Sequence, residues 1–366
     1  MARKRAAGRR KRRKKNKEGA AERIPPLLDF RGKAWYNKKK ASGKGICVEK
    51  LCEERDKRAL YREVLLLCLI FVLHLGLNTL LSQILVLTGL FETAELDPSG
   101  TALAIAQNRV QLVAYLGTYV GTFALPLGIY LIVRHRDPDR EYFRLAPPND
   151  WRLVFVGAMG ALAVNYYFTM LSQASAIWNP LSSGDLIAVT GDPVSDLLVF
   201  LILVPAPALL EEACFRGVIC GRIARYNGGV AVFVSALLFG MMHMNFGQIP
   251  FAFCVGLILG YVYLATGSFW GGVVIHAINN ALAYVSLTVD FYTNSSRTAS
   301  LIFIGCFAVL FLIGLGCLCA MALRPRRLCV QPRLSGKAAM GAAMANPLMI
   351  LSLAVMLCGA FLGSAL

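Results

Sequence analysis

Apolar segments long enough to cross a bilayer recur along most of the chain, separated by short polar stretches. A membrane-spanning helix needs about 20 apolar residues, because the hydrocarbon core is about 30 Å thick and a helix rises about 1.5 Å per residue. The pattern therefore predicts an all-α polytopic membrane protein with about eight to nine transmembrane helices. We expect them at residues 64–90, 110–133, 153–175, 196–222, 229–245, 251–266, 269–289, 300–323 and 347–366.

Charge is distributed very unevenly along the chain. Residues 1–62 carry 23 of the 38 Lys and Arg residues but only 7 of the 21 Asp and Glu residues. So many like charges with so little apolar content predict a disordered basic tail. Basic segments remain on the cytoplasmic side of a membrane, which places the N-terminus in the cytoplasm. We expect this tail to bind anionic lipid headgroups and consider nucleic acid an unlikely partner.

The loops carry charges that agree with this orientation. Loop 134–152 and the segment after residue 323 are rich in Arg, as expected for inner loops, whereas loops 91–109 and 176–195 are mainly acidic. We predict four parts: a tail at 1–62, N-terminal transmembrane helices at 63–150, a core with polar membrane residues at 151–290, and C-terminal transmembrane helices at 291–366.

Two adjacent carboxylates and a guanidinium, Glu211, Glu212 and Arg216, interrupt the fourth apolar segment. A charge at the bilayer centre costs about 2.5–3.5 kcal/mol on insertion scales, so such residues indicate a functional site. Glu212 and Arg216 are four residues apart and can pair on one helix face, while Glu211 points about 100° away. Pro205 and Pro207 would break the helix just upstream, which a membrane tolerates only where protein or a wet cavity covers the break. The stretch therefore predicts a polar pocket within the bilayer.

Further polar side chains lie at membrane depth on the following segments. His243 comes one helical turn after Phe239, and His276 comes one turn before Asn280. Either pair alone is compatible with interhelical hydrogen bonding. Together with Glu211 they bring an acid, two imidazoles and an amide into one bundle, which favours a functional site over a purely structural network.

Such a set allows three chemistries. A carboxylate and an imidazole can activate water while a second imidazole and an amide stabilise an oxyanion. Glu211, His243 and His276 could instead hold a divalent metal ion such as zinc. Cys214 is a candidate nucleophile, although neighbouring carboxylates disfavour the thiolate which that role needs.

Three motifs in this order resemble those of a known family. The EExxxR, FxxxH and HxxxN motifs of the CPBP intramembrane proteases are similar to Glu211-Glu212-Ala213-Cys214-Phe215-Arg216, Phe239-Gly240-Met241-Met242-His243 and His276-Ala277-Ile278-Asn279-Asn280. That family includes the CAAX-processing Rce1-type endopeptidases and bacterial relatives formerly called the abortive-infection family. The resemblance covers about residues 150–290, less than half of the chain.

The resemblance implies an all-helical endopeptidase that cleaves a membrane-associated protein or peptide, in this case in a bacterial plasma membrane. Glu211, helped by His243, would activate water. His276 and Asn280 would form the oxyanion site. The last one or two helices and the basic tail lie outside the resemblance.

The same resemblance makes Glu212 and Arg216 a supporting ion pair and leaves the catalytic type open between a glutamate protease and a metalloprotease; we favour a reaction without metal. Two other classes remain: a non-catalytic scaffold or bacteriocin self-immunity protein, and a proton-coupled transporter, which also needs intramembrane acids and histidines. The chain shows no internal repeat and confines its polar residues to one region, which disfavours the transporter.

The depth of His243 limits how the site can assemble. If segment 229–245 crossed the bilayer completely, His243 would lie near the outer face, whereas Glu211 lies about 22 Å inward from the outer end of its helix. We therefore expect that this segment does not span and that the linker 244–250 is enclosed by protein at membrane depth.

Overall fold

The computed structural model describes residues 45–89, 101–135, 143–174, 188–294 and 296–365. Residues 55–366 form one compact unit, and residues 1–54 form another. The expectations for most of the basic tail, for loop 91–100 and for much of loop 176–195 therefore concern residues outside the described part of the chain.

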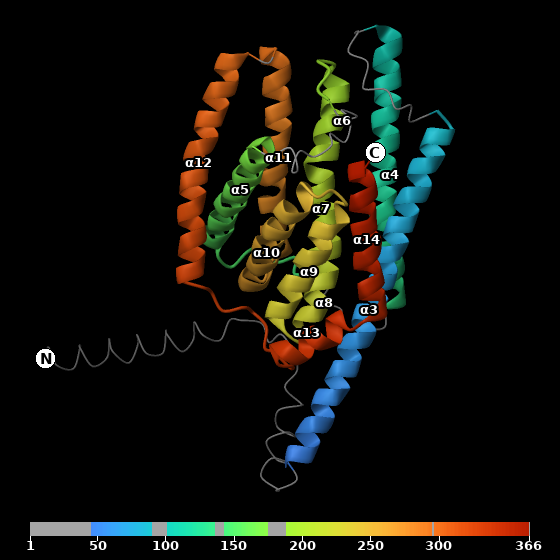
Figure 1. Cartoon of the computed structure of the whole chain (residues 1–366), viewed down its shortest axis with the longest axis vertical. Helices are drawn as coiled ribbons and strands as arrows, with labels where there is room; N and C mark the ends of the chain where they lie inside the picture. The colour runs from blue at the N-terminus through green and yellow to red at the C-terminus, as the bar shows by residue number, and fades with distance from the viewer. Residues whose placement is uncertain (1–44, 90–100, 136–142, 175–187, 295, 366) are drawn as a thin grey trace, which may run out of the picture. The chain divides into compact units, whose positions relative to one another are not determined.

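All regular structure in the described residues is helical (Figure 1). The helices are α3 (Gly45–Leu87), α4 (Ala102–Val133), α5 (Trp151–Ala174), α6 (Pro193–Leu203), α7 (Pro205–Glu212), the π-helix η1 (Ala213–Cys220), α8 (Gly221–Ala224), α9 (Gly228–Met242), α10 (Gln248–Thr266), α11 (Phe269–Thr293), α12 (Arg297–Leu323), α13 (Gly336–Met344) and α14 (Pro347–Ala365). The prediction of a polytopic all-α membrane protein is confirmed.

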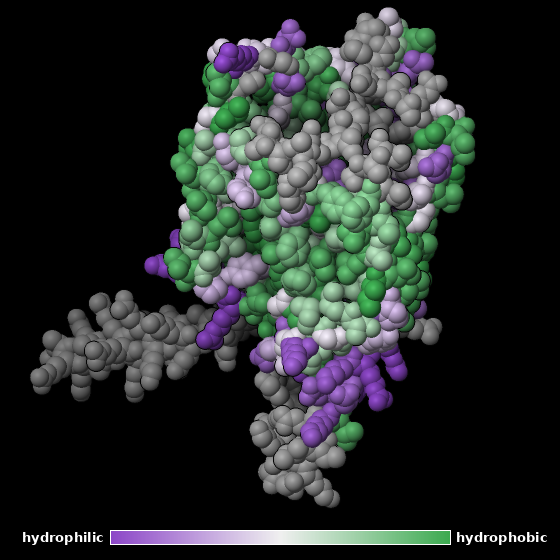
Figure 2. Space-filling model, viewed as in Figure 1, coloured by the Kyte–Doolittle hydropathy of each residue, from purple (hydrophilic) through white to green (hydrophobic). Residues whose placement is uncertain are grey.

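The described chain contains 7 apolar helical stretches long enough to cross a membrane, or up to 8 if the pair α13 and α14, bent by 67°, counts as one span. The upper expectation of nine fails because α9 has only 15 residues. At about 1.5 Å per residue it is roughly 22 Å long, shorter than the hydrocarbon core. In Figure 2 hydrophobic side chains cover the middle of the visible face, and hydrophilic ones gather toward its ends.

The short helix α9 and its successor α10 form a hairpin that enters and leaves at the same end of the bundle. Tyr226, just before α9, accepts backbone hydrogen bonds from Arg333, while Thr266 at the end of α10 accepts one from Asn149. Both partners belong to the Arg-rich loops predicted to lie inside. The turn between the two helices therefore lies within the bundle (Figure 1), as the depth of His243 requires.

The start of the first helix and one additional helix differ from the expectation. The first helix begins at Gly45, so residues 45–62, assigned to the disordered tail, are helical. A charged extension of a membrane helix can remain helical outside the apolar core, because the span itself nucleates it. Helix α13 was not expected; Ser335 caps it by accepting a hydrogen bond from the Ala338 N–H.

The predicted fourth span is broken into four consecutive helical pieces, α6, α7, η1 and α8. Helix α6 ends at Leu203 because Pro205 and Pro207 lack backbone N–H groups and cannot continue its hydrogen bonding. The π-helix η1 follows directly after Glu212. Such wide turns are rare and frequently mark functional sites.

At its other end α6 is capped by Asp192, which accepts from the Ser195 N–H at 2.9 Å. Arg109 of α4 pairs with the same carboxylate at 2.7 Å. The Arg109 hydrogen bonds hold the pKa of Asp192 well below its usual range. This pair fastens the start of the broken helix to α4.

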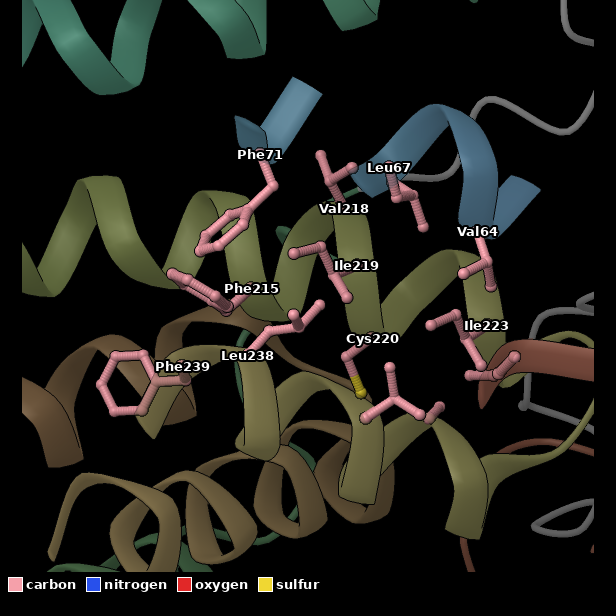
Figure 3. Packing of buried hydrophobic residues seen from close by; sticks show 14 of the residues in the cluster. Val64, Leu67, Phe71, Phe215, Val218, Ile219, Cys220, Ile223, Leu238 and Phe239 are labelled. Atoms are coloured by element: carbon pink, nitrogen blue, oxygen red, sulfur yellow. The ribbon is translucent and has the colours of Figure 1, made fainter. Parts of the chain in front are cut away.

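The π-helix is held between α3 and α9 by a large apolar core (Figure 3). Phe71 of α3 lies edge-on to Phe215, with ring centroids 5.9 Å apart, and Phe215 lies edge-on to Phe239 of α9 at 5.2 Å. Val218 and Ile219 point from η1 into the same core (Figure 3). Tight packing on both sides fixes the direction of the polar residues at the start of η1.

A buried carboxylate, Glu63 of α3, joins three helices near the Arg-rich end. It accepts hydrogen bonds from Tyr130 at 2.8 Å and from Arg222 at 2.8 Å. Arg134 also pairs with it. Because the carboxylate pairs with both Arg134 and Arg222, it links α3 and α4 to α8, which continues the helix that carries Glu211.

We expect Glu63→Gln to lower the free energy of unfolding by about 3 kcal/mol, because it removes a buried negative charge that pairs with two guanidinium groups. Thermal denaturation in detergent measures this loss. Asp150→Asn is the control: its ion pair with Arg326, whose side chain is 65% exposed, contributes at most about 1 kcal/mol. Equal losses for the two variants would contradict the structural role of Glu63.

Candidate active site

An ion pair between Glu212 and Arg216 lies at the centre of the candidate site. Glu212 Oε1 accepts from Arg216 Nη1 at 2.8 Å and from His276 Nδ1 at 3.0 Å. Both Glu212 and Arg216 are completely buried. Charges inside an apolar bundle persist only when paired, so this carboxylate, guanidinium and imidazole form one cluster. The expected pairing of Glu212 with Arg216 is present.

Glu211 lies on a different face of α7 from Glu212, and it contacts the other nitrogen of the His276 imidazole. Its Oε2 lies 3.7 Å from His276 Nε2, and its Oε1 accepts a hydrogen bond from the Tyr119 hydroxyl of α4. His276 therefore lies between two carboxylates. Among the described residues, the imidazole in contact with Glu211 is that of His276; the help that the resemblance implies from His243 stays a prediction.

The contacts define which nitrogen of His276 is available for chemistry. A carboxylate in an ion pair only accepts hydrogen bonds, so His276 Nδ1 carries the hydrogen donated to Glu212. The Nε2 atom is then directed to Glu211. Fixing one nitrogen through a carboxylate sets both the tautomer and the ring orientation of an imidazole.

His243 reaches the cluster through Phe239. It is the C-cap of α9, and its Nδ1 donates to the Phe239 carbonyl at 2.9 Å, which makes Nε2 the acceptor atom of the neutral ring. The Phe239 ring lies edge-to-face with His243 at 5.3 Å and with His276 at 5.7 Å. Arg216 stacks over the same ring at 4.4 Å. One aromatic side chain thus contacts both imidazoles and the guanidinium.

The backbone next to His243 is strained. Met244 has a φ of 45°, in the left-handed region that residues other than glycine seldom adopt. Strain of this kind collects at functional sites, where the surrounding packing maintains it. It allows the chain to reverse within the bundle directly after the imidazole.

The linker after His243 is covered in part, as expected for a turn at membrane depth. Residues 244–247 are half-buried, and only Gln248 of the segment 244–250 is exposed. Phe246 lies against Phe361 of α14, with ring centroids 4.9 Å apart. Helix α14, which lies outside the motif-bearing region, therefore helps to cover the site.

Asn280 belongs to a short series of amides. Its Oδ1 accepts from Asn279 Nδ2 at 3.4 Å, and Asn279 Oδ1 accepts from Asn165 of α5 at 3.2 Å. Asn279 is buried and Asn280 half-buried. The series lies one turn beyond His276 on α11 and directs the Asn280 amide.

Two other residues lie outside this cluster of contacts. His74 is buried, and its Nδ1 donates to the Thr122 carbonyl at 2.8 Å. Cys214, the candidate nucleophile of the sequence analysis, is half-buried in η1 and lines an apolar cavity of about 40 Å³. Among the described residues Cys214 has no cationic partner of the kind that activates a thiol.

Several contributors to the site escaped sequence reasoning. Tyr119 lies in a span without any motif; its spacing of four residues from Tyr115 was a weak signal of a polar helix face. Asn165 and Asn279 also went unnoticed. Gly272 has a packing reason: a Cβ there would lie 2.5 Å from Glu212 Oε2. Contacts between helices decide all four, so their roles could not be read from linear spacing.

The described residues contain no group of three His, Cys, Asp or Glu side chains arranged to hold a metal ion. The Nδ1 atom of His276 donates to Glu212, whereas its Nε2 atom faces Glu211. A divalent metal ion held by Glu211, His243 and His276 stays a prediction, and the reaction steps below use the chain's own side chains.

Comparisons with known proteins found a likeness over the same part of the chain. Residues 193–282 match the family model described as type II CAAX prenyl endopeptidase Rce1-like. This segment is therefore similar to the CPBP family, which includes the Rce1-type endopeptidases. The CPBP match contains every motif residue of the cluster, from Glu211 on α7 to Asn280 on α11.

A curated relative shows the same likeness over a longer stretch. The membrane-embedded CAAX protease MroQ of Staphylococcus aureus (strain USA300) is 24% identical over 218 residues, which cover 56% of this chain and 84% of the relative. No solved structure matches the chain. The family match and the relative support a CAAX-type protease of the membrane as the broad class.

Gly272→Ala tests how tightly the helices pack around the cluster of Glu212, Arg216 and His276. We expect it to lower stability by about 1–3 kcal/mol, because the new methyl group must displace the buried Glu212 carboxylate. The matched control is Gly121→Ala in α4, where a Cβ meets nothing within 4 Å and the helix propensity improves. Thermal unfolding of both variants decides; a Gly272→Ala protein as stable as the control would show that Glu212 is not held as described.

Proposed function

We propose that the protein is an intramembrane endopeptidase that hydrolyses a peptide bond of a membrane-associated protein or peptide. The observation that carries this proposal is the placement of Glu211 and His276 Nε2, 3.7 Å apart, inside an apolar helical bundle. The spacing brings a base and an imidazole to one point where a water molecule and a carbonyl group can meet. The similarity of residues 193–282 to the Rce1-like family and the CAAX protease relative support the same reaction class.

In the proposed reaction Glu211 removes a proton from a water molecule, and the resulting hydroxide attacks the carbonyl carbon of the substrate. The carbonyl oxygen becomes an oxyanion, the C–N bond then breaks, and the proton held by Glu211 passes to the leaving amine. Tyr119 holds one carboxylate oxygen, so the other remains directed at the water. His243, whose Nε2 is an acceptor, assists in moving the proton.

His276 and Asn280, one turn apart on α11, supply the oxyanion donors. Since Nδ1 already donates to Glu212, His276 can donate to an oxyanion only from Nε2, in its doubly protonated form. Glu212 and Arg216 position this ring and neutralise one another. Preorganised donors in a site without bulk water stabilise developing charge much more than water does.

Glu211→Gln should abolish hydrolysis, with a loss of about 10²–10⁴-fold or more in kcat, because an amide cannot take a proton from water. Cleavage of a fluorogenic peptide library by purified protein in detergent or liposomes measures it. Glu63→Gln is the matched control: it also removes a buried carboxylate, but one remote from His276, so the folded fraction should retain its kcat. Unchanged turnover in Glu211→Gln would contradict the mechanism, and ion flux through liposomes without any hydrolysis would favour a carrier.

Tyr119→Phe should lower kcat about tenfold or more while leaving KM nearly unchanged. A hydrogen bond to a charged group contributes about 1.5–3 kcal/mol, and here it orients the base and not the substrate. Tyr167→Phe on α5, at a side chain that is 54% exposed, is the control and should behave as wild type. A change confined to KM would show that Tyr119 binds substrate and does not position Glu211.

A further inference from the structure

A second polar region lies along α11, toward the end remote from the Arg-rich loops. It contains a cavity of about 570 Å³ between α5, α11 and α12. Ligand sites in proteins commonly have volumes of about 300–1,000 Å³. We call this space the α11 chamber. It is lined by Asn165 and Thr169 of α5, by residues of α11 from Leu282 to Thr293, and by Phe303 and Phe307 of α12.

The α11 chamber carries polar groups at helical spacing. Ser286, Asp290 and Thr293 of α11 follow one another by four and three residues and line the same wall. Ser286 and Asp290 are exposed, so the chamber is open to its surroundings. Placing an acid and hydroxyl groups against hydrocarbon costs free energy, which makes a lipid acyl chain a poor occupant.

The chamber is connected to the candidate active site by a side chain that belongs to both. Asn165 lines the chamber and donates to Asn279, which in turn donates to Asn280. Asn280 is the expected oxyanion donor, one turn from His276 on the same helix. The wall from Leu282 to Thr293 is about 16 Å long, which accommodates about five residues of extended peptide.

We propose that the α11 chamber binds an extended, uncharged peptide segment of the substrate, next to the bond that is cut. This inference rests on the proposed function. The Ser286 and Thr293 hydroxyl oxygens of α11 accept hydrogen bonds from main-chain N–H groups, and Phe303 and Phe307 contact the side chains of the peptide. An unpaired peptide group in a membrane is costly, so a row of acceptors beside the site lowers the free energy of a substrate unwound there.

Thiol labelling in proteoliposomes tests the chamber without requiring hydrolysis. Ser286→Cys is made in the Glu211→Gln protein, and its modification by a cationic methanethiosulfonate reagent is followed by mass spectrometry of the labelled peptide. We expect modification about tenfold faster than for Ile302→Cys, because a thiolate forms only where water reaches the sulfur. Ile302 is 63% exposed but points about 140° away from Phe307 on α12. Ala283→Cys is a second chamber position should Ser286→Cys not fold.

A pool of uncharged decapeptides is then added, and we expect it to slow the labelling of Ser286→Cys severalfold without affecting Ile302→Cys. Equal labelling of the two positions, labelling that peptides do not slow, or protection by oleate alone would each overturn the proposal. Equal labelling would show that the chamber is dry, and labelling that peptides do not slow would show that it holds only water. Protection by oleate alone would show that it binds an acyl chain. Because Glu211→Gln cannot hydrolyse peptides under the proposed mechanism, failure here is separate from failure of the proposed function, which the turnover of the wild-type protein decides.

Discussion

The burial of one ion pair, Glu212 with Arg216, constrains most of the structure around it. Neither side chain has any exposure to solvent. A carboxylate and a guanidinium inside an apolar bundle are tolerated only when they are paired and further hydrogen bonds support the pair. His276 supplies one, the Gly256 carbonyl accepts from Arg216 at 3.3 Å, and the Phe239 ring receives the face of the guanidinium. Three helices besides their own must therefore converge on this pair.

Convergence at this depth explains the irregular backbone of the region. The proline break before α7 and the π-helix η1 after it frame the two carboxylates. Besides His276, which both contact, Glu211 contacts Tyr119 and Glu212 contacts Arg216. The α9–α10 hairpin ends inside the bundle, with Met244 in a strained conformation, so that His243 reaches the same level. Nonhelical backbone within a membrane requires cover by protein, and α14 provides part of it through Phe361.

The packing of these helices also gives the two adjacent carboxylates, Glu211 and Glu212, different surroundings. Glu212 Oε1 accepts hydrogen bonds from both Arg216 and His276, while Glu211 keeps one oxygen facing the imidazole. Two adjacent carboxylates in different surroundings are a recurrent device for dividing structural and chemical roles. The amides beyond His276 extend the polar region along α11 to the chamber, so that substrate binding and chemistry would share one helix.

The sequence by itself determined the class of protein, the approximate spans, the pairing of Glu212 with Arg216 and the motif residues, because hydropathy and helical spacing act locally. The sequence also indicated that α9 does not cross the membrane, since at the end of a full span His243 would lie too far from Glu211. Only the tertiary structure decided that His276 is the imidazole beside Glu211, that Tyr119 holds the carboxylate and that Gly272 makes room for Glu212. These depend on distances between helices far apart in the chain, which packing against α3, α4 and α11 sets and which no local pattern encodes.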